Sequence, residues 1–358
     1  MTTKGMCRRL KAALIVFAIA MAHSSVTTGQ ERRPGDLRVA GPYNHKNLSI
    51  FLIQGPDRWK GRTPLTLQQA LGQKKVVVHE TGTVQKLAIE NLSPEEEVYV
   101  QFGDIVKGGN QDRVLVTDLV LPPHGGKVSI AAFCVEPGRW SRRGKEAAGW
   151  FSSSEQQLPS KDLKVAAGVK ADQQEVWKAV GATRERLSRA AAVPGGVAGA
   201  GSGTFVAAPP PAMPASSSLA LMVEAKEVRK SAEDYTKALG TTVNDKPDVV
   251  GYAFAVNGKL VGAEVYSSQS LFRGMWAKLL KAAALEAMAD DEKDAKVEPV
   301  SSEAVKRFLD AAESKPSSDR AVTDRIKVLK KETDQTIVFE SWDRKQAGGW
   351  VHRSYVAK

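Results

Sequence analysis

Cysteine is nearly absent from this chain, which has Cys7 and Cys134 as its two cysteines among 358 residues. Cys7 precedes an apolar segment that we expect to be removed together with it, so the mature chain has no pair for an intramolecular disulfide. In an oxidising compartment the hydrophobic core must therefore hold the fold without cross-links.

The remaining thiol is a weak candidate for catalysis. A nucleophilic Cys134 would need a basic neighbour that lowers its pKa. His79, His124 and His352 are available, but no spacing in the sequence places any of them beside the thiol. We expect Cys134 to be a buried, inert strand residue.

Several patterns that bind metals, nucleotides or nucleic acids are also missing. The chain has no His-x-His, His-x-x-x-His or paired-cysteine pattern, so we expect no metal site. No glycine loop is followed by the Lys-Ser/Thr of a phosphate-binding loop. Lysine and arginine are scattered among acidic residues without a dense basic stripe, so nucleic-acid binding is not expected. No cofactor is predicted.

The longest apolar run lies at the N-terminus and is too short for a membrane span, which needs about 20 residues. It covers residues 12–21 and ends in the small-x-small pattern Ala20-Met21-Ala22. Four basic and no acidic residues precede it: Lys4, Arg8, Arg9 and Lys11. These are the parts of a signal peptide over residues 1–22, with an uncleaved anchor as the alternative. We expect export to the periplasm or the extracellular space and no membrane span after cleavage.

Composition divides the rest of the chain into four parts. A polar leader over residues 23–40 precedes a β-rich half over 41–190, and residues 191–218 form an Ala/Gly/Pro/Ser-rich flexible insertion. Residues 219–358 are a mixed helix and hairpin half. Removing the four basic residues of the signal lowers the formal charge from +11 to +7. The predicted fold class is α+β, with a sandwich-like or barrel-like N-terminal half.

Short apolar runs predict the elements of the β-rich half. A run over 48–53 and a helical pattern over 65–71 are followed by closely spaced strand candidates. The strand candidates are 75–80, 84–90, 98–102, 114–120 and 128–135. The period then changes, and 172–190 reads as a helix with Asp172 as its N-cap.

The C-terminal half shows clearer signals. Residues 219–239 predict one long helix that ends at Gly240, and 269–289 predict another whose apolar stripe packs in the core. Between them, Asn257-Gly258 joins strands 249–256 and 259–266 in a hairpin. A short helix over 303–312 and terminal strands that include 336–342 and 350–356 complete the chain.

Two motifs in the first half carry the candidate site. They are Gly108-Gly109-Asn110-Gln111-Asp112-Arg113 and Cys134-Val135-Glu136-Pro137-Gly138-Arg139-Trp140. Glycine permits a close approach of the backbone to a ligand, arginine offers forked donors and tryptophan offers a stacking face. The candidate ligand-binding residues are Gly108, Gly109, Gln111, Arg113, Glu136, Arg139 and Trp140, with Glu136 as the candidate general base.

Each motif also has a structural interpretation. The glycine pair could be an ordinary hairpin turn. Arg113 or Arg139 could pair with Glu136 in a buried bridge between two strands, with Trp140 in the core. A pair of catalytic carboxylates, Glu136 with Glu80 or with Asp104, is a further alternative.

In order along the chain, these features resemble a known family. The landmarks are Asn47-Leu48, Thr66-Leu67-x-x-Ala70-Leu71, the strand ending at Glu80, Gly108-Gly109-x-Gln111-x-Arg113, Cys134-Val135-Glu136-x-Gly138-Arg139-Trp140, Gln174-Glu175-Val176-Trp177, Gly262-x-Glu264-x-Tyr266, Leu271-Phe272 and Trp276. They resemble the ARG and rhodanese-phosphatase-superfamily-associated protein domain over about residues 40–357. That family is largely bacterial and has no established activity. Its name implies, by analogy alone, a nucleotide-like or ADP-ribose-like ligand.

Three functions remain open from the sequence. The first is an exported protein that binds a small polar or anionic ligand at the two motifs. The second is a hydrolase of a phosphate- or ribose-containing substrate, with Glu136 as general base and arginines stabilising negative charge. The third is a structural or partner-binding protein without a ligand site. The sequence names no protein partner.

Overall fold

The computed structural model describes residues 37–143, 150–192, 217–290, 298–311, 317–346 and 349–358. The predicted signal peptide lies outside these residues, as do most of the predicted leader and of the predicted flexible insertion. Among the described residues no helix is long and apolar enough to cross a membrane.

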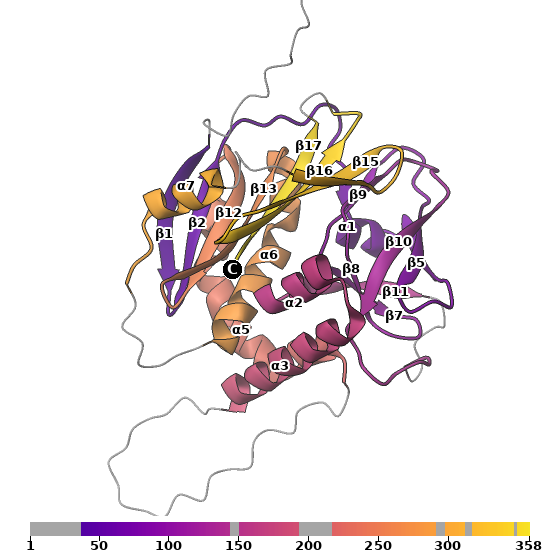
Figure 1. Cartoon of the computed structure of the whole chain (residues 1–358), viewed down its shortest axis with the longest axis horizontal. Helices are drawn as coiled ribbons and strands as arrows, with labels where there is room; N and C mark the ends of the chain where they lie inside the picture. The colour runs from indigo at the N-terminus through magenta and orange to yellow at the C-terminus, as the bar shows by residue number, and fades with distance from the viewer. Residues whose placement is uncertain (1–36, 144–149, 193–216, 291–297, 312–316, 347–348) are drawn as a thin grey trace, which may run out of the picture. The chain divides into compact units, whose positions relative to one another are not determined.

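One antiparallel sheet of eight strands dominates the molecule and takes strands from both halves of the chain (Figure 1). The N-terminal strand β2 lies beside β12, with Leu48 paired to Val256. The order is β1 (Arg38–His45), β2 (Leu48–Gln54), β12 (Val249–Val256), β13 (Lys259–Tyr266), β17 (Trp350–Ala357), β16 (Thr336–Asp343), β15 (Ile326–Glu332) and β14 (Ser317–Ala321). The two predicted halves therefore share a sheet, and the described residues form one compact unit.

The centre of this sheet is buried on both faces, which explains why its strands read as continuous apolar runs. Every residue of β12 is buried. Helix α7 (Ser302–Asp310) covers one face with Val305 and Leu309. Helix α6 (Gln269–Ala289) lies on the other face, and its apolar stripe joins the largest core cluster as expected. The predicted hairpin at Asn257-Gly258 is confirmed, and both turn residues have positive φ angles.

Two smaller sheets make the N-terminal half β-rich, with a half-barrel sheet, and confirm the α+β class. The six-stranded sheet has the order β11 (Phe151–Gln157), β7 (Asp104–Gly108), β8 (Arg113–Leu115), β10 (Lys127–Cys134), β5 (Lys86–Asn91) and β4 (Val76–Glu80). The three-stranded sheet contains β3 (Leu65–Thr66), β6 (Val98–Val100) and β9 (Leu119–Leu121), with β3 parallel to β6.

The remaining helices follow their capping signals. The short helix α1 (Leu67–Gly72) begins at Thr66, whose side chain forms a capping box with Gln69. Asp172 accepts hydrogen bonds from the first backbone N–H groups of α3 (Gln173–Ala192), as predicted. The helical segments α2 (Lys161–Val165) and η2 (Ala166–Lys170) precede it, and η3 (Gly240–Val243) follows α5 (Lys226–Leu239).

Two predictions about the elements were wrong. The single helix predicted over 219–239 is two helices, α4 (Leu219–Glu224) and α5, because Ala225 between them has an extended ψ of 141°. The strand predicted over 114–120 is divided into β8 and β9, which belong to different sheets. Strand β1 was not predicted; it begins at Arg38, within residues 23–40 of the predicted polar leader, and its partly exposed residues at the sheet edge have no continuous apolar pattern.

Candidate functional site

The Gly108-Gly109 turn at the end of β7 approaches protein atoms rather than open space. A Cβ atom on Gly108 would lie 2.3 Å from the carbonyl oxygen of Trp150, and one on Gly109 would lie 2.4 Å from a carboxylate oxygen of Glu80. The φ angles are +127° and +51°. The Asn110 backbone N–H also donates to Glu80, at 2.7 Å. The close approach that the glycines permit is therefore made to strands β4 and β11.

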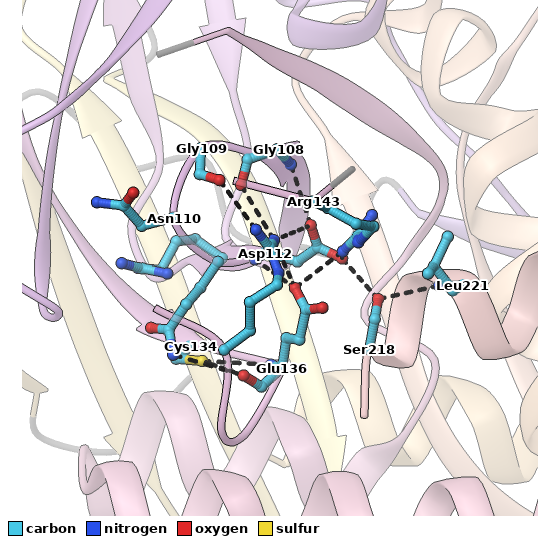
Figure 2. Close-up of polar contacts among 12 residues, drawn as sticks. Gly108, Gly109, Asn110, Asp112, Cys134, Glu136, Arg143, Ser218 and Leu221 are labelled. Carbon is cyan, nitrogen blue, oxygen red and sulfur yellow. Dashed lines mark hydrogen bonds and ion pairs between the residues drawn. The ribbon is translucent and has the colours of Figure 1, made fainter. Parts of the chain in front are cut away.

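Asp112 is a buried carboxylate where several parts of the chain meet (Figure 2). It accepts a hydrogen bond from the Gly108 backbone N–H at 3.0 Å and one from the Ser218 hydroxyl at 2.6 Å. Nη2 of Arg143 lies 2.7 Å from Oδ2, the oxygen that also accepts from Ser218, and Nη2 of Arg139 lies 3.5 Å from Oδ1. The carboxylate is thus held by a turn, a loop and the start of α4.

Glu136 faces the same two arginines. Its Oε2 atom lies 2.6 Å from Arg139 and 2.8 Å from Arg143, and it accepts the Asp112 backbone N–H at 3.2 Å. Burial by itself would raise the pKa of Glu136, but the hydrogen bonds from Arg139 and Asp112 and the charge of Arg143 outweigh burial and lower it. A carboxylate held in this way is a weak general base.

We name Asp112, Glu136, Arg139, Arg143 and Ser218 the ionic clasp. Ser218 caps α4 by accepting the Leu221 backbone N–H at 3.1 Å, and at the same time it donates to Asp112 (Figure 2). Arg139 also donates to the carbonyl oxygen of Gly109 at 2.9 Å. The clasp therefore ties both sequence motifs to the beginning of the C-terminal half.

The bridge that the sequence suggested exists for Arg139, which pairs with Glu136. Trp140, however, is 47% exposed and does not belong to the core. Gln111 donates weakly to the Glu136 carbonyl oxygen at 3.5 Å, while its own side-chain oxygen has no hydrogen-bond partner in the described part of the chain.

Arg113 differs from the clasp arginines. Its side chain has no exposed surface, and its Nε atom donates to the Val84 carbonyl oxygen at 3.0 Å. Neither terminal nitrogen has a hydrogen-bond acceptor among the residues that the structure describes. The nearest carboxylate oxygen, on Glu80, is 3.9 Å away, and the Trp140 ring lies 5.4 Å from the guanidinium carbon. Burial lowers the pKa of this guanidinium, against the charge of Glu80.

The other candidates have local partners. The Cys134 thiol is buried and donates to the Glu136 carbonyl oxygen at 3.1 Å, and burial raises its pKa. Asp104 does not join Glu136 but pairs with Lys278 at 2.5 Å. Within the described ranges, no three His, Cys, Asp or Glu side chains are grouped so that they could hold a metal ion.

Sequence reasoning missed a second charged centre, at His352 on β17. Its Nδ1 atom lies 2.9 Å from Asp118, and its Nε2 atom lies 2.7 Å from Glu264 on β13. Burial alone would lower the pKa of His352, but the two carboxylates raise it to about 9. Burial would raise the pKa of Glu264, yet Lys164 and His352 lower it to about 2. The imidazole is therefore a buried cation between two anions.

Hydroxyl and amide groups complete the His352 centre. Asp118 accepts hydrogen bonds from the Phe102 backbone N–H at 2.6 Å and from the Ser341 hydroxyl at 2.7 Å. Ser354 donates to Glu264 at 3.0 Å. The sequence contained one signal for this centre, because Glu264 is an acidic residue within an otherwise apolar strand. No sequence pattern showed that His352 would lie beside Glu264.

A small cavity of about 60 Å³ adjoins this centre. One wall is aromatic, with the rings of Phe102 and Phe339 5.5 Å apart in an edge-to-face arrangement. The buried hydroxyl of Thr117 lines the cavity and has no hydrogen-bond partner in the described structure. The other lining residues are Val116, Asp118, Gly168, Arg320, Val328, Ser341, His352 and Ser354.

Together these features define an α+β protein whose halves are joined by a shared sheet and an ionic clasp, with a small polar-ended cavity beside a buried histidine. The chain belongs to the ARG and Rhodanese-Phosphatase-superfamily-associated Protein domain family, whose model matches residues 36–356. This match confirms the resemblance that the sequence landmarks carry. No curated protein and no solved structure matches the chain.

Proposed function

We propose that this protein binds a small molecule with one acidic group in the cavity beside His352. The observation that carries the proposal is the Thr117 hydroxyl, which is buried in the cavity wall without a partner in the described structure. Leaving a buried hydroxyl unsatisfied costs roughly 1–3 kcal/mol. A polar atom of a bound ligand would remove that cost, so the site is arranged for an occupant.

The size of the cavity defines the class of ligand. A water-sized group needs roughly 10–15 Å³, so about 60 Å³ takes about four to six such groups. Phe102, Phe339 and Val328 supply apolar walls, and the exposed Arg320 supplies a positive charge. A carboxylate with a short apolar chain, such as butyrate, fits this combination, whereas a whole nucleotide is too large.

The His352 centre supports binding better than hydrolysis. Both imidazole nitrogens are held by carboxylates, so neither presents a proton to the cavity. The centre instead fixes the polar end of the cavity, because Asp118 is held by His352, Ser341 and the Phe102 backbone. Binding sites commonly have this form, with mostly apolar walls and a few positioned polar groups.

Calorimetric titration of the mature protein with butyrate tests the proposal, with 1-butanol as the ligand that lacks the carboxylate. We expect Thr117→Val, which removes the hydroxyl at nearly constant volume, to weaken butyrate binding about tenfold. Arg320→Gln should weaken butyrate but not 1-butanol. Arg344→Gln is the matched control, because this arginine is also exposed but does not line the cavity. Equal affinity of all four proteins would overturn the proposal.

We further propose that binding takes place outside the cytoplasm. The support is the basic, apolar and small-residue pattern of residues 1–22. N-terminal sequencing of the protein recovered from a secreting host should then begin near His23. Soluble cytosolic protein with an intact Met1 would refute export without affecting the ligand site.

A further inference from the structure

We infer that Arg113 forms a second site, which binds an anion beneath Trp140. The site is separate from the cavity beside His352 and does not depend on it. Arg113 is fully buried, and both of its terminal nitrogens lack a hydrogen-bond acceptor in the described residues. A buried charge is expensive unless it is paired and hydrogen-bonded, so such an arrangement implies a missing partner.

The neighbours of Arg113 do not satisfy it. Val84 accepts the Nε–H and leaves the fork of terminal nitrogens unused. Glu80 lies beyond hydrogen-bond distance at 3.9 Å, and its other oxygen already accepts the Asn110 backbone N–H. Burial lowers the pKa of Arg113, as expected for a cation that has lost its hydrating water and has not gained an equal number of hydrogen bonds from the protein.

The ionic clasp explains why no carboxylate is hydrogen-bonded to Arg113 although acidic residues lie nearby. Asp112 and Glu136 pair with Arg139 and Arg143 at distances of 2.6–3.5 Å. The clasp therefore uses the acidic groups of the two motifs and keeps the Gly109 carbonyl oxygen turned toward Arg139. Arg113, on the same motif, stays available for an external anion.

The chemistry of the occupant follows from the guanidinium and the indole. Two parallel N–H groups suit a carboxylate or a phosphate bound through two oxygens. Trp140 lies over the guanidinium and is 47% exposed, an unusual position for a large apolar ring. A ligand with a planar ring and a phosphate group would stack on the indole as it moves aside and bring its anion to Arg113.

Thermal unfolding of the full mature protein with three probes tests this assignment. AMP carries ring and anion, adenosine carries the ring alone, and inorganic phosphate carries the anion alone. We expect AMP to raise Tm most, phosphate to raise it less and adenosine to leave it unchanged. Arg113→Met should abolish both shifts, and Arg142→Met, at an exposed arginine of the same loop, should preserve them.

The stability of the unliganded variant gives an independent readout. If Arg113 awaits an anion, Arg113→Met removes an unsatisfied buried charge, and its urea midpoint should equal or exceed that of the wild type. A lower midpoint together with an unchanged or absent AMP shift would show a structural arginine and overturn the inference. Butyrate binding reports the cavity separately, so failure at one site is distinguishable from failure at the other.

Discussion

Asp112 faces donors from three separate stretches of the sequence: Gly108 on its own turn, Arg139 and Arg143 about 30 residues further on, and Ser218 at the start of α4. In a buried site, a carboxylate that faces two guanidinium groups is difficult to replace, because its loss leaves Glu136 as the one remaining clasp carboxylate against both cations. Its importance is therefore one of charge balance rather than of shape alone.

We accordingly expect Asp112→Asn to destabilise the fold by about 3–5 kcal/mol, although the side chain keeps its size. Urea unfolding monitored by circular dichroism provides the measurement. Asp319→Asn is the control, since this aspartate is exposed on β14 and should change stability by less than about 0.5 kcal/mol. A cost below about 1 kcal/mol for Asp112→Asn would contradict a clasp role.

His352 predicts a dependence of stability on pH. Its pKa is about 9 in the folded protein, above the ordinary value of 6.5. The stability that it contributes is therefore complete below pH 6.5 and is lost as the pH rises through 9, by roughly 3 kcal/mol in all. Glu264 acts in the opposite direction, since its pKa of about 2 means that its contribution is lost as the pH falls from 4.5 toward 2.

Urea midpoints measured between pH 6 and pH 10 should show this alkaline loss in the wild type. His352→Gln should be less stable at pH 6 but should have a flatter profile above pH 6.5. The same substitution at the exposed His124 should leave the profile unchanged. A wild-type midpoint that stays constant from pH 6.5 to pH 10 would show that His352 is not a buried cation.

Among the structural elements, the turn between β7 and β8 is closely surrounded by other parts of the chain. We expect Gly108→Ala to cost at least about 3 kcal/mol, because the new Cβ would meet the Trp150 carbonyl oxygen at 2.3 Å in addition to the strain of a positive φ. Gly126→Ala isolates the strain, since Gly126 also has a positive φ but open space around it. Its expected cost is about 1–2 kcal/mol. Equal losses in urea unfolding would refute the close approach.

Local sequence patterns predicted the elements that are marked by a turn motif, a helical apolar stripe or a capping residue. The Asn257-Gly258 hairpin, the helix over 269–289 and the Asp172 cap appear where they were expected. Strands whose position depends on distant parts of the chain have no clear signal in their own sequence. The edge strand β1 is polar, and β8 and β9 read as one run because both are apolar and only Val116, Thr117 and Asp118 separate them.

The candidate site was predicted in part. The two motifs lie side by side, as predicted. The sequence could not show that Arg143 would pair with Asp112 or that the Ser218 hydroxyl would donate a hydrogen bond to it. It also could not show that His352 lies between Asp118 and Glu264, because β9, β13 and β17 become neighbours only in the assembled fold. Composition reveals which charges are present, whereas topology decides which of them meet.

For the whole molecule, the shared eight-stranded sheet makes the two halves of the chain interdependent. We expect residues 36–192 and 217–358, expressed together as two chains, to assemble, because β2 pairs with β12 and Leu219 donates to the Val135 carbonyl oxygen. A tag on one fragment should retain the other during purification. Asp112→Asn should weaken this association, and Asp319→Asn should not. Independent folding of both fragments without association would contradict the shared sheet.

The pairing of β2 with β12 also sets an order of events during synthesis. The first hairpin of the sheet, β1 and β2, is translated long before its neighbour, and β17 and β16 come last of all. Contacts between such distant segments form slowly and only after the chain is nearly complete. The β1–β2 hairpin therefore has no β12 to pair with until the C-terminal half of the chain has been made, whereas the six-stranded and three-stranded sheets take all their strands from the N-terminal half.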